Sequence, residues 1–175
     1  MAPTFSTPIK LMSFSILFFL IINIVNAQQS NLVYYLQDIG KGNNPTVATV
    51  IGINGRVWSY NTFGTIFVVD DPVLLEPSPL STQVGKAQGV ITVTSIDGAN
   101  VNIVLSLVFN DVQYGRSTLQ IQGSSHQRDN LRELSVIGGT GRFRFARGYV
   151  VFETVSYDPT NNHSVIKLAI TLSIP

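Results

Sequence analysis

Two side chains, Asp38 and Arg132, are candidates for a pair that transfers a proton or anchors a phenol oxygen. Asp38 ends a run of aromatic and aliphatic residues, and Arg132 opens a short apolar run much later in the chain. A carboxylate can accept the proton of a phenol, and a guanidinium can hold an anionic oxygen. Together, around an aromatic-lined cavity, they would suit a phenolic ligand. Asp38 is equally consistent with a turn or capping carboxylate, a role that Asp70 and Asp71, before Pro72, could share.

Arg132 belongs to an unusual cluster. Five arginines lie within residues 128–147, namely Arg128, Arg132, Arg142, Arg144 and Arg147. This bias is informative because only 12% of the residues are charged. The planar guanidinium hydrogen-bonds oxygen-rich ligands and stacks on aromatic rings. We expect most of the five to form surface ion pairs with Asp129, Glu133 or Glu153, and Arg132 to be the one that points inward.

Other chemistries find little support in the sequence. The chain has no cysteine, which excludes disulfides and Cys-ligated zinc or iron–sulfur sites, and it has neither HExxH nor GxSxG. We interpret His126 as a solvated loop residue. Residues 136–141 look like the start of a dinucleotide fingerprint, but Arg144 replaces the third glycine, so a tight turn between strands is favoured. We expect no cofactor, and the formal charge of +1 disfavours nucleic acid as a partner.

The first residues are typical of a secretory signal peptide. Lys10 precedes the apolar stretch 11–25, and Val25-Asn26-Ala27 provides small residues for cleavage after Ala27. A membrane anchor is the alternative, but the stretch is short and contains serine and asparagine. We therefore predict a leader over residues 1–27 and one secreted, extracellular domain over residues 28–175, with no membrane segment after cleavage. Asn162-His163-Ser164 is a glycosylation sequon in a predicted exposed turn.

The elements that must position these residues are strands. Apolar residues alternate with period two in eight segments, which are residues 32–36, 64–69, 89–94, 101–109, 117–122, 134–137, 149–155 and 165–174. Glycine, asparagine and proline signals separate most of them. Eight regularly spaced strands predict an all-β antiparallel sandwich or closed barrel, and closure would remove the exposed edges. Residues 72–81 are the predicted long surface loop.

The motifs resemble those of the plant dirigent family across essentially the whole mature chain. The matching segments are Tyr35-Leu-Gln-Asp38, Phe63-Gly-Thr-Ile-Phe-Val-Val-Asp-Asp-Pro72, Val84-Gly-Lys-Ala-Gln-Gly89, Gly115-Arg-Ser-Thr-Leu119 and the run from Arg132 to Gly148. This resemblance implies an eight-stranded antiparallel β-barrel with a central pocket, usually trimeric. It also implies an apoplastic protein that binds phenoxy radicals made by an oxidase or peroxidase and directs their stereoselective coupling, as toward lignans. Some relatives are lyase-like and assist water loss through a quinone methide, as in pterocarpan formation.

The family's site residues carry over in part. The first-strand His-Asp appears as Gln37-Asp38, and the pocket arginine is Arg132. Ser125 stands where lignan-forming members usually have an acid, and Ile91 stands where an aromatic residue is usual. The resemblance thus leaves Asp38 and Arg132 as the catalytic pair and adds Ser125 and Ile91 as substrate-binding positions. It argues against pinoresinol-type coupling and against a mechanism with two acids.

Three functions fit these residues. The first is a guide for radical coupling that does not itself oxidise the phenol, with an oxidase or peroxidase as partner. The second is a cofactor-free lyase or cyclase in which Asp38 transfers a proton and Arg132 stabilises a phenolate. The third is a secreted, phenol-binding defence protein without chemistry. For each of them, the resemblance implies a homo-oligomer, a trimer or a dimer.

Overall fold

The computed structural model describes residues 28–174. The predicted leader and its cleavage site after Ala27 lie outside the described residues. Within this part of the chain, no helix has the length and apolar character needed to cross a membrane.

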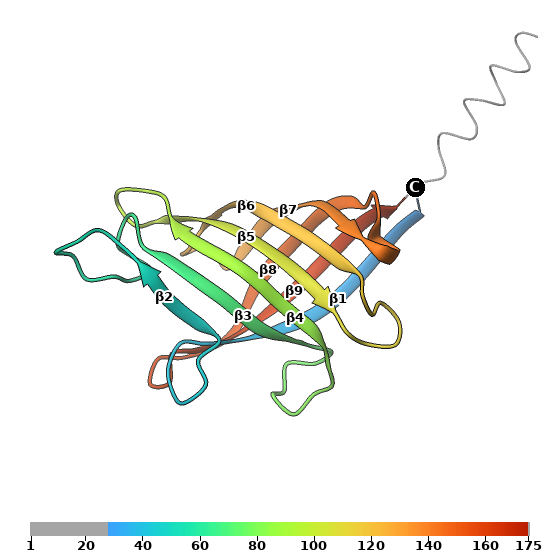
Figure 1. The fold of residues 1–175 in the computed structure, drawn as a ribbon, viewed down its shortest axis with the longest axis horizontal. Coiled ribbons are helices and arrows are strands. Elements are labelled where there is room, and N and C mark those ends of the chain that lie inside the picture. Colours follow the sequence, from blue (N-terminus) through green and yellow to red (C-terminus); the bar gives the residue numbers. More distant parts are fainter. Residues whose placement is uncertain (1–27, 175) are drawn as a thin grey trace, which may run out of the picture.

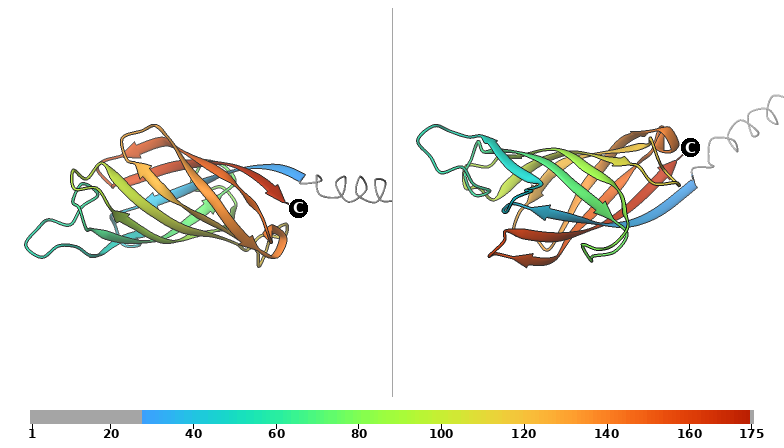
Figure 2. Two further views of the ribbon diagram at one scale, coloured as in Figure 1. Left: turned by 90° about the horizontal axis from the view of Figure 1, so that it is seen from above. Right: turned by 60° about the horizontal axis from the view of Figure 1, so that its bottom comes forward.

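The described chain is one antiparallel sheet that wraps into a closed barrel (Figures 1 and 2). Its strands are β1 (Gln28–Ile39), β2 (Val47–Ile51), β3 (Ile66–Leu74), β4 (Gln83–Val93), β5 (Asn100–Phe109), β6 (Thr118–His126), β7 (Leu131–Thr140), β8 (Arg147–Asp158) and β9 (His163–Ile174). The order is β1-β9-β8-β7-β6-β5-β4-β3-β2, and β1 also pairs with β3. Eight strands therefore close the barrel, and β2 extends the sheet beside β3.

The predicted eight-stranded antiparallel barrel is confirmed, with two local differences. The sequence pattern did not indicate β2, because only its first residue, Val47, is buried. The second difference is at Asp70-Asp71-Pro72, which we predicted to end a strand. Instead β3 runs on to Leu74, so the following loop begins at Leu75 rather than at Pro72.

Pro72 is tolerated in β3 because of where it lies. β3 pairs with β2 through Val69 and with β1 only from Val73 onward. Pro72 lies between these two paired regions. The backbone nitrogens of Asp70 and Pro72, two residues apart in the strand, point to the same edge of β3, where the Asp70 N–H donates to the Thr46 carbonyl. The missing N–H of the proline therefore removes no ladder hydrogen bond from the sheet.

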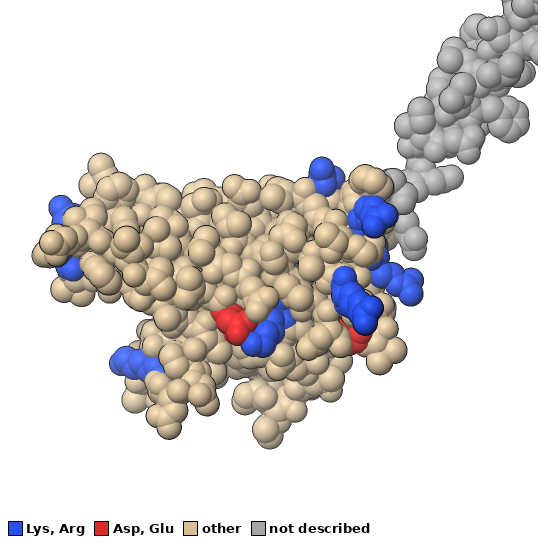
Figure 3. All heavy atoms as spheres, in the orientation of Figure 1, with Lys and Arg blue, Asp and Glu red and all other residues tan. Residues whose placement is uncertain are grey.

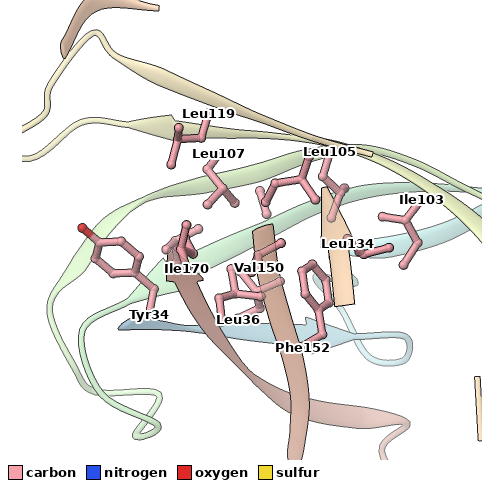
Figure 4. Packing of buried hydrophobic residues seen from close by; sticks show 14 of the residues in the cluster. Tyr34, Leu36, Ile103, Leu105, Leu107, Leu119, Leu134, Val150, Phe152 and Ile170 are labelled. Carbon is pink, nitrogen blue, oxygen red and sulfur yellow. The ribbon is translucent and has the colours of Figure 1, made fainter. Parts of the chain in front are cut away.

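Strict alternation along the strands builds the interior of the barrel. Buried residues alternate with half-buried or exposed ones along β3 and β5, as expected for strands with one face on a core. Figure 4 shows the inward side chains, including Leu36, Leu105, Val150 and Ile170, packed against one another. Burial of this apolar surface is the main source of stability in a chain without disulfides.

Aromatic rings fill one end of the barrel, which we call the closed end. Phe109 lies 5.6 Å from Tyr34, 5.6 Å from Tyr114 and 5.3 Å from Phe143, between ring centroids. Phe143 belongs to η1 (Gly141–Phe143), the short turn that links β7 to β8. The predicted glycine-rich turn starts only at Gly141, where φ is 60°, because the preceding glycines complete β7. These rings fill the closed end, and the cavity described below lies among residues of the other half of the barrel.

Candidate ligand pocket

The open half of the barrel contains a cavity of about 240 Å³. Its polar lining comes from the strands and from three connections, which contribute Tyr60, Gln127 and Asn162, and its apolar lining comes from the barrel interior. The lining residues are Leu36, Asp38, Tyr60, Val69, Asp71, Ile91, Val101, Ile103, Leu105, Ser125, Gln127, Arg132, Phe152, Thr154, Tyr157, Asn162, Ser164 and Ile166. An apolar wall with a few convergent polar groups is the usual form of a small-molecule site.

All four residues predicted to contact a ligand line this cavity. Asp38 lies at the end of β1 and Arg132 near the start of β7, and these strand ends lie together at the mouth. Ser125 on β6 is 4% exposed, and Ile91 on β4 is half-buried. The structure therefore brings together residues that are far apart in the sequence.

A second acid lies in the same cavity, which the sequence analysis did not predict. Asp71 is only 2% exposed, and it lines the cavity with Asp38. Because β3 continues past Asp70, alternation turns Asp71 inward behind the buried Phe67 and Val69. The inference that the site holds one acid is therefore wrong. The signal was present as the alternation of positions 67, 69, 71 and 73, but the Asp-Asp-Pro sequence was interpreted as a turn.

The two acids differ in how strongly they hold a proton. Burial raises the pKa of Asp71 to about 8, and the negative charge of Asp38 adds to this effect. Burial also raises the pKa of Asp38, to about 6, although the Arg132 guanidinium acts in the opposite direction. Near pH 7, Asp71 is therefore mostly protonated and Asp38 mostly ionised. Two acids separated in this way can serve as proton donor and proton acceptor.

Arg132 is oriented by β8. Its Nη2 donates a 2.8 Å hydrogen bond to Thr154 Oγ1, while its Nε is buried without a hydrogen-bond partner among the described residues. Asp71 Oδ1 is likewise buried without such a partner. Unsatisfied buried polar atoms are costly and rare. Both atoms belong to residues that line the cavity, although neither atom is itself exposed to it.

Tyr60 provides an aromatic wall near the acids. Its ring stacks on Phe67 with centroids 4.0 Å apart and an interplanar angle of 6°. Gln127 fixes the backbone at this point, since its Nε2 donates a 2.6 Å hydrogen bond to the Tyr60 carbonyl. Burial, Asp38 and Asp71 all raise the pKa of Tyr60, so its hydroxyl stays protonated. A ligand ring could extend this stack.

The sequon residue Asn162 lies at the mouth of the cavity. It has a left-handed backbone with φ of 47°, which asparagine tolerates, and its carbonyl accepts a hydrogen bond from the Gly40 N–H. The Tyr157 hydroxyl donates a 3.1 Å hydrogen bond to Asn162 Oδ1. Asn162 is half-buried, and any group attached to its Nδ2 would stand beside the cavity entrance.

The structure leaves His126 exposed, as predicted, but it does not contain the ion pairs predicted for the arginine cluster. His126 is exposed at the end of β6, and its Nδ1 lies 3.0 Å from Asp129 Oδ1. The ion pairs predicted for the arginine cluster are absent among residues 28–174, where the salt bridges involve Lys86, His126 and Lys167. In the same part of the chain, no group of three His, Asp or Glu side chains is arranged to hold a metal ion.

A closed antiparallel β-barrel with an acid- and arginine-lined cavity defines a class of small-molecule-binding barrel proteins. The family model described as Dirigent-like protein matches residues 29–173. The chain therefore belongs to the dirigent family.

Relatives of two kinds are found within the family. Pterocarpan synthase 1 of Glycyrrhiza echinata is 34% identical over 139 residues, which cover 79% of this chain and 74% of the relative. Dirigent protein 23 of Arabidopsis thaliana is 32% identical over 143 residues, covering 82% and 76%. The solved structure of the pterocarpan synthase dirigent protein GePTS1 superposes with a TM-score of 0.78 at 32% identity, covering 85% of this chain and 86% of that one.

Proposed function

We propose that this protein catalyses the cofactor-free loss of water from a phenolic benzylic alcohol, through a quinone methide. The observation that carries the proposal is the pair of acids with separated pKa values beside Arg132 in one cavity. The similarity to pterocarpan synthases supports the same chemistry, because those relatives are named for a ring-closed phenolic product. A cavity of about 240 Å³ suits one aromatic substrate better than two.

The proposed steps balance in protons. Protonated Asp71 donates its proton to the benzylic hydroxyl, and the C–O bond breaks to release water. Ionised Asp38 accepts the proton of the conjugated phenol, while Arg132 holds the oxygen as its charge develops. A second phenol of the same substrate then adds to the methide carbon. Its proton goes to Asp71, and Asp38 returns its own proton to the methide oxygen, so both acids recover their starting states.

An assay with and without a one-electron oxidant tests this proposal. We expect turnover of a benzylic-alcohol phenol without oxidant, and a single enantiomer of the ring-closed product. Failure to convert any such phenol without oxidant, combined with an altered enantiomer ratio when oxidant and monolignols are present, would contradict it.

That result would instead favour the second candidate, guidance of phenoxy-radical coupling. The relatives named dirigent proteins and the apolar side of the cavity, which includes Ile103 and Phe152, support that candidate.

The rate of water loss should depend on pH in the shape of a bell. Asp38 must be ionised, so kcat rises as pH increases through about 6. Asp71 must be protonated, so kcat falls as pH increases through about 8. The two carboxyls interact, and the measured values therefore belong to the pair. Initial rates between about pH 4 and pH 10 would check this. A rate that stays constant between pH 5 and 9 is incompatible with the proposed roles.

We further propose that the protein is secreted and assembles with copies of itself. Val68, Val90 and Val104 are exposed on the outside of three adjacent strands and pair directly across the sheet. Figure 3 shows that this side of the barrel carries few charged groups. A neutral apolar face is typical of contacts between identical subunits.

Sedimentation analysis checks this assembly. We expect the unmodified chain to sediment as a trimer or dimer and Val90→Lys to sediment as a monomer, because a buried lysine would lack a partner. Val33→Lys on β1 is the matched control, since Val33 is also exposed on a strand but lies outside this face. A monomeric unmodified chain, or equal dissociation of both variants, would refute the proposed face.

A further inference from the structure

Four arginines gather at the closed end of the barrel and have no part in the pocket. Arg116 lies in the β5–β6 connection, Arg142 in η1, Arg144 just after it, and Arg147 at the start of β8. All four are exposed. The two loops are tied together, because the Arg142 N–H donates a 3.0 Å hydrogen bond to Ser117 Oγ. Figure 3 shows blue side chains gathered at the right-hand end of the barrel, where these loops lie in Figure 1.

The positive charge of this end is not neutralised within residues 28–174. None of the four arginines forms a salt bridge with an Asp or Glu of this part of the chain. Asp111 is the acid of the same connecting loops, and its Oδ1 is occupied by the Tyr114 N–H. The whole sequence is nearly balanced, with 11 Lys+Arg and 10 Asp+Glu. A local excess of this kind creates a field that attracts anions.

An exposed aromatic ring lies among these arginines. Phe145 is 72% exposed and has a φ of 64°, a conformation that is uncommon for a bulky residue. Its neighbours hold it there, since Phe143 is 2% exposed and Ala146 is 0% exposed. The turn thus has two buried anchors, and it presents Phe145 outward between the arginines. We call Arg116, Arg142, Arg144, Arg147 and Phe145 the arginine end.

We propose that the arginine end binds a carboxylate-bearing polysaccharide. Guanidinium groups pair with planar carboxylates through two parallel hydrogen bonds, and a polymer with repeated carboxylates can engage several arginines at once. The Phe145 ring offers an apolar surface for the face of a sugar ring. Binding of single-stranded nucleic acid would require a series of aromatic platforms, and the arginine end has one exposed ring.

The position of the arginine end has a consequence for the pocket. The aromatic residues Tyr34, Phe109, Tyr114 and Phe143 fill the barrel between the arginine end and the cavity. A polymer bound at the closed end therefore leaves the mouth, where Tyr157 and Asn162 lie, open to small molecules. The protein would be held on an acidic polymer while its pocket stays accessible.

The test measures binding of the secreted chain to immobilised polygalacturonate. We expect binding at about 20 mM salt that weakens strongly at about 300 mM salt, since exposed charges are screened. The double variant Arg142→Ser/Arg144→Ser should bind about tenfold or more weakly. Arg142→Lys/Arg144→Lys, which keeps the charge but not the planar fork, should lose part of the affinity. Phe145→Ser should weaken binding without changing the salt dependence. Circular dichroism establishes that each variant is folded.

A matched control distinguishes binding through the arginine end from an effect of the protein's overall charge. Arg56→Ser/Arg128→Ser removes the same charge from exposed residues of the loops near the cavity mouth, and we expect it to bind like the unmodified chain. Equal weakening by both double variants would overturn the proposal, as would the absence of binding at low salt. Equally tight binding of single-stranded DNA would also overturn it, because the end would then recognise charge alone. Turnover in the pocket should be the same in all these variants.

Discussion

Replacing Asp38 with Asn should reduce oxidant-free water loss by about 10²- to 10⁴-fold in kcat while leaving the barrel folded. The amide keeps the shape of the carboxyl but cannot accept the phenol proton. KM should change little, because the apolar side of the cavity, including Leu105 and Phe152, still binds the substrate. Steady-state kinetics at pH 7, where Asp38 is mostly ionised, would measure the effect.

Asp70→Asn is the control for this experiment. Asp70 is adjacent to the pocket acid Asp71 in sequence, but it is exposed on the outside of β3 and hydrogen-bonded by Lys86 and Gln88. We expect its variant to retain full activity. If Asp38→Asn is folded and as active as Asp70→Asn, then Asp38 is not the proton acceptor.

Replacing Asp71 with Asn should stabilise the protein at pH 8 while it abolishes activity. Burial raises the pKa of Asp71 from its ordinary value of 3.8 to about 8 in the folded protein. A raised folded-state pKa means that the folded state binds the proton more tightly than the unfolded state. Its contribution to stability is therefore complete below about pH 4 and is lost as pH rises through about 8. At pH 8 the loss is on the order of a few kcal/mol, and the neutral amide avoids it.

Thermal unfolding of both variants between pH 4 and pH 8 tests this sign. The gain in Tm of Asp71→Asn over the unmodified chain should grow with pH. Asp70→Asn should instead show a Tm loss that is nearly independent of pH over this range, because hydrogen bonds from Lys86 and Gln88 lower the pKa of Asp70 and their contribution is lost only below about pH 4. A Tm difference for Asp71→Asn that is independent of pH would mean that Asp71 has an ordinary pKa.

The acid that matters most for these predictions is the one that sequence reasoning missed. Alternation of apolar residues was enough to predict eight strands, and it placed Arg132 on the inner face of β7. Asp-Asp-Pro was interpreted as a turn because each of its residues favours turns. What overrides this preference is long-range pairing with β1 and β4, together with the gap in which Pro72 lies. Pairing of that kind cannot be read from a local segment.

The edge strand β2 was missed for a related reason. Its residues from Ala48 to Ile51 are exposed, so the segment lacks the alternation that marks a half-buried strand. It is ordered by hydrogen bonds to β3 rather than by burial of its own side chains. The ion pairs expected for the arginine cluster also did not form for Arg142, Arg144 and Arg147, because these arginines lie at the η1 end of β7 and β8, whereas Glu133 and Glu153 lie level with the start of β7.

The central claim is that one carboxyl of the pocket holds its proton at neutral pH while the other has lost it. A carbon-13 NMR titration of the aspartate side-chain carboxyls measures this directly and requires no substrate. We predict that one carboxyl titrates at about 6 and a second at about 8, and that Asp71→Asn removes the second. If every aspartate carboxyl titrates at its ordinary value near 4, the proposed division of proton donor and acceptor is wrong.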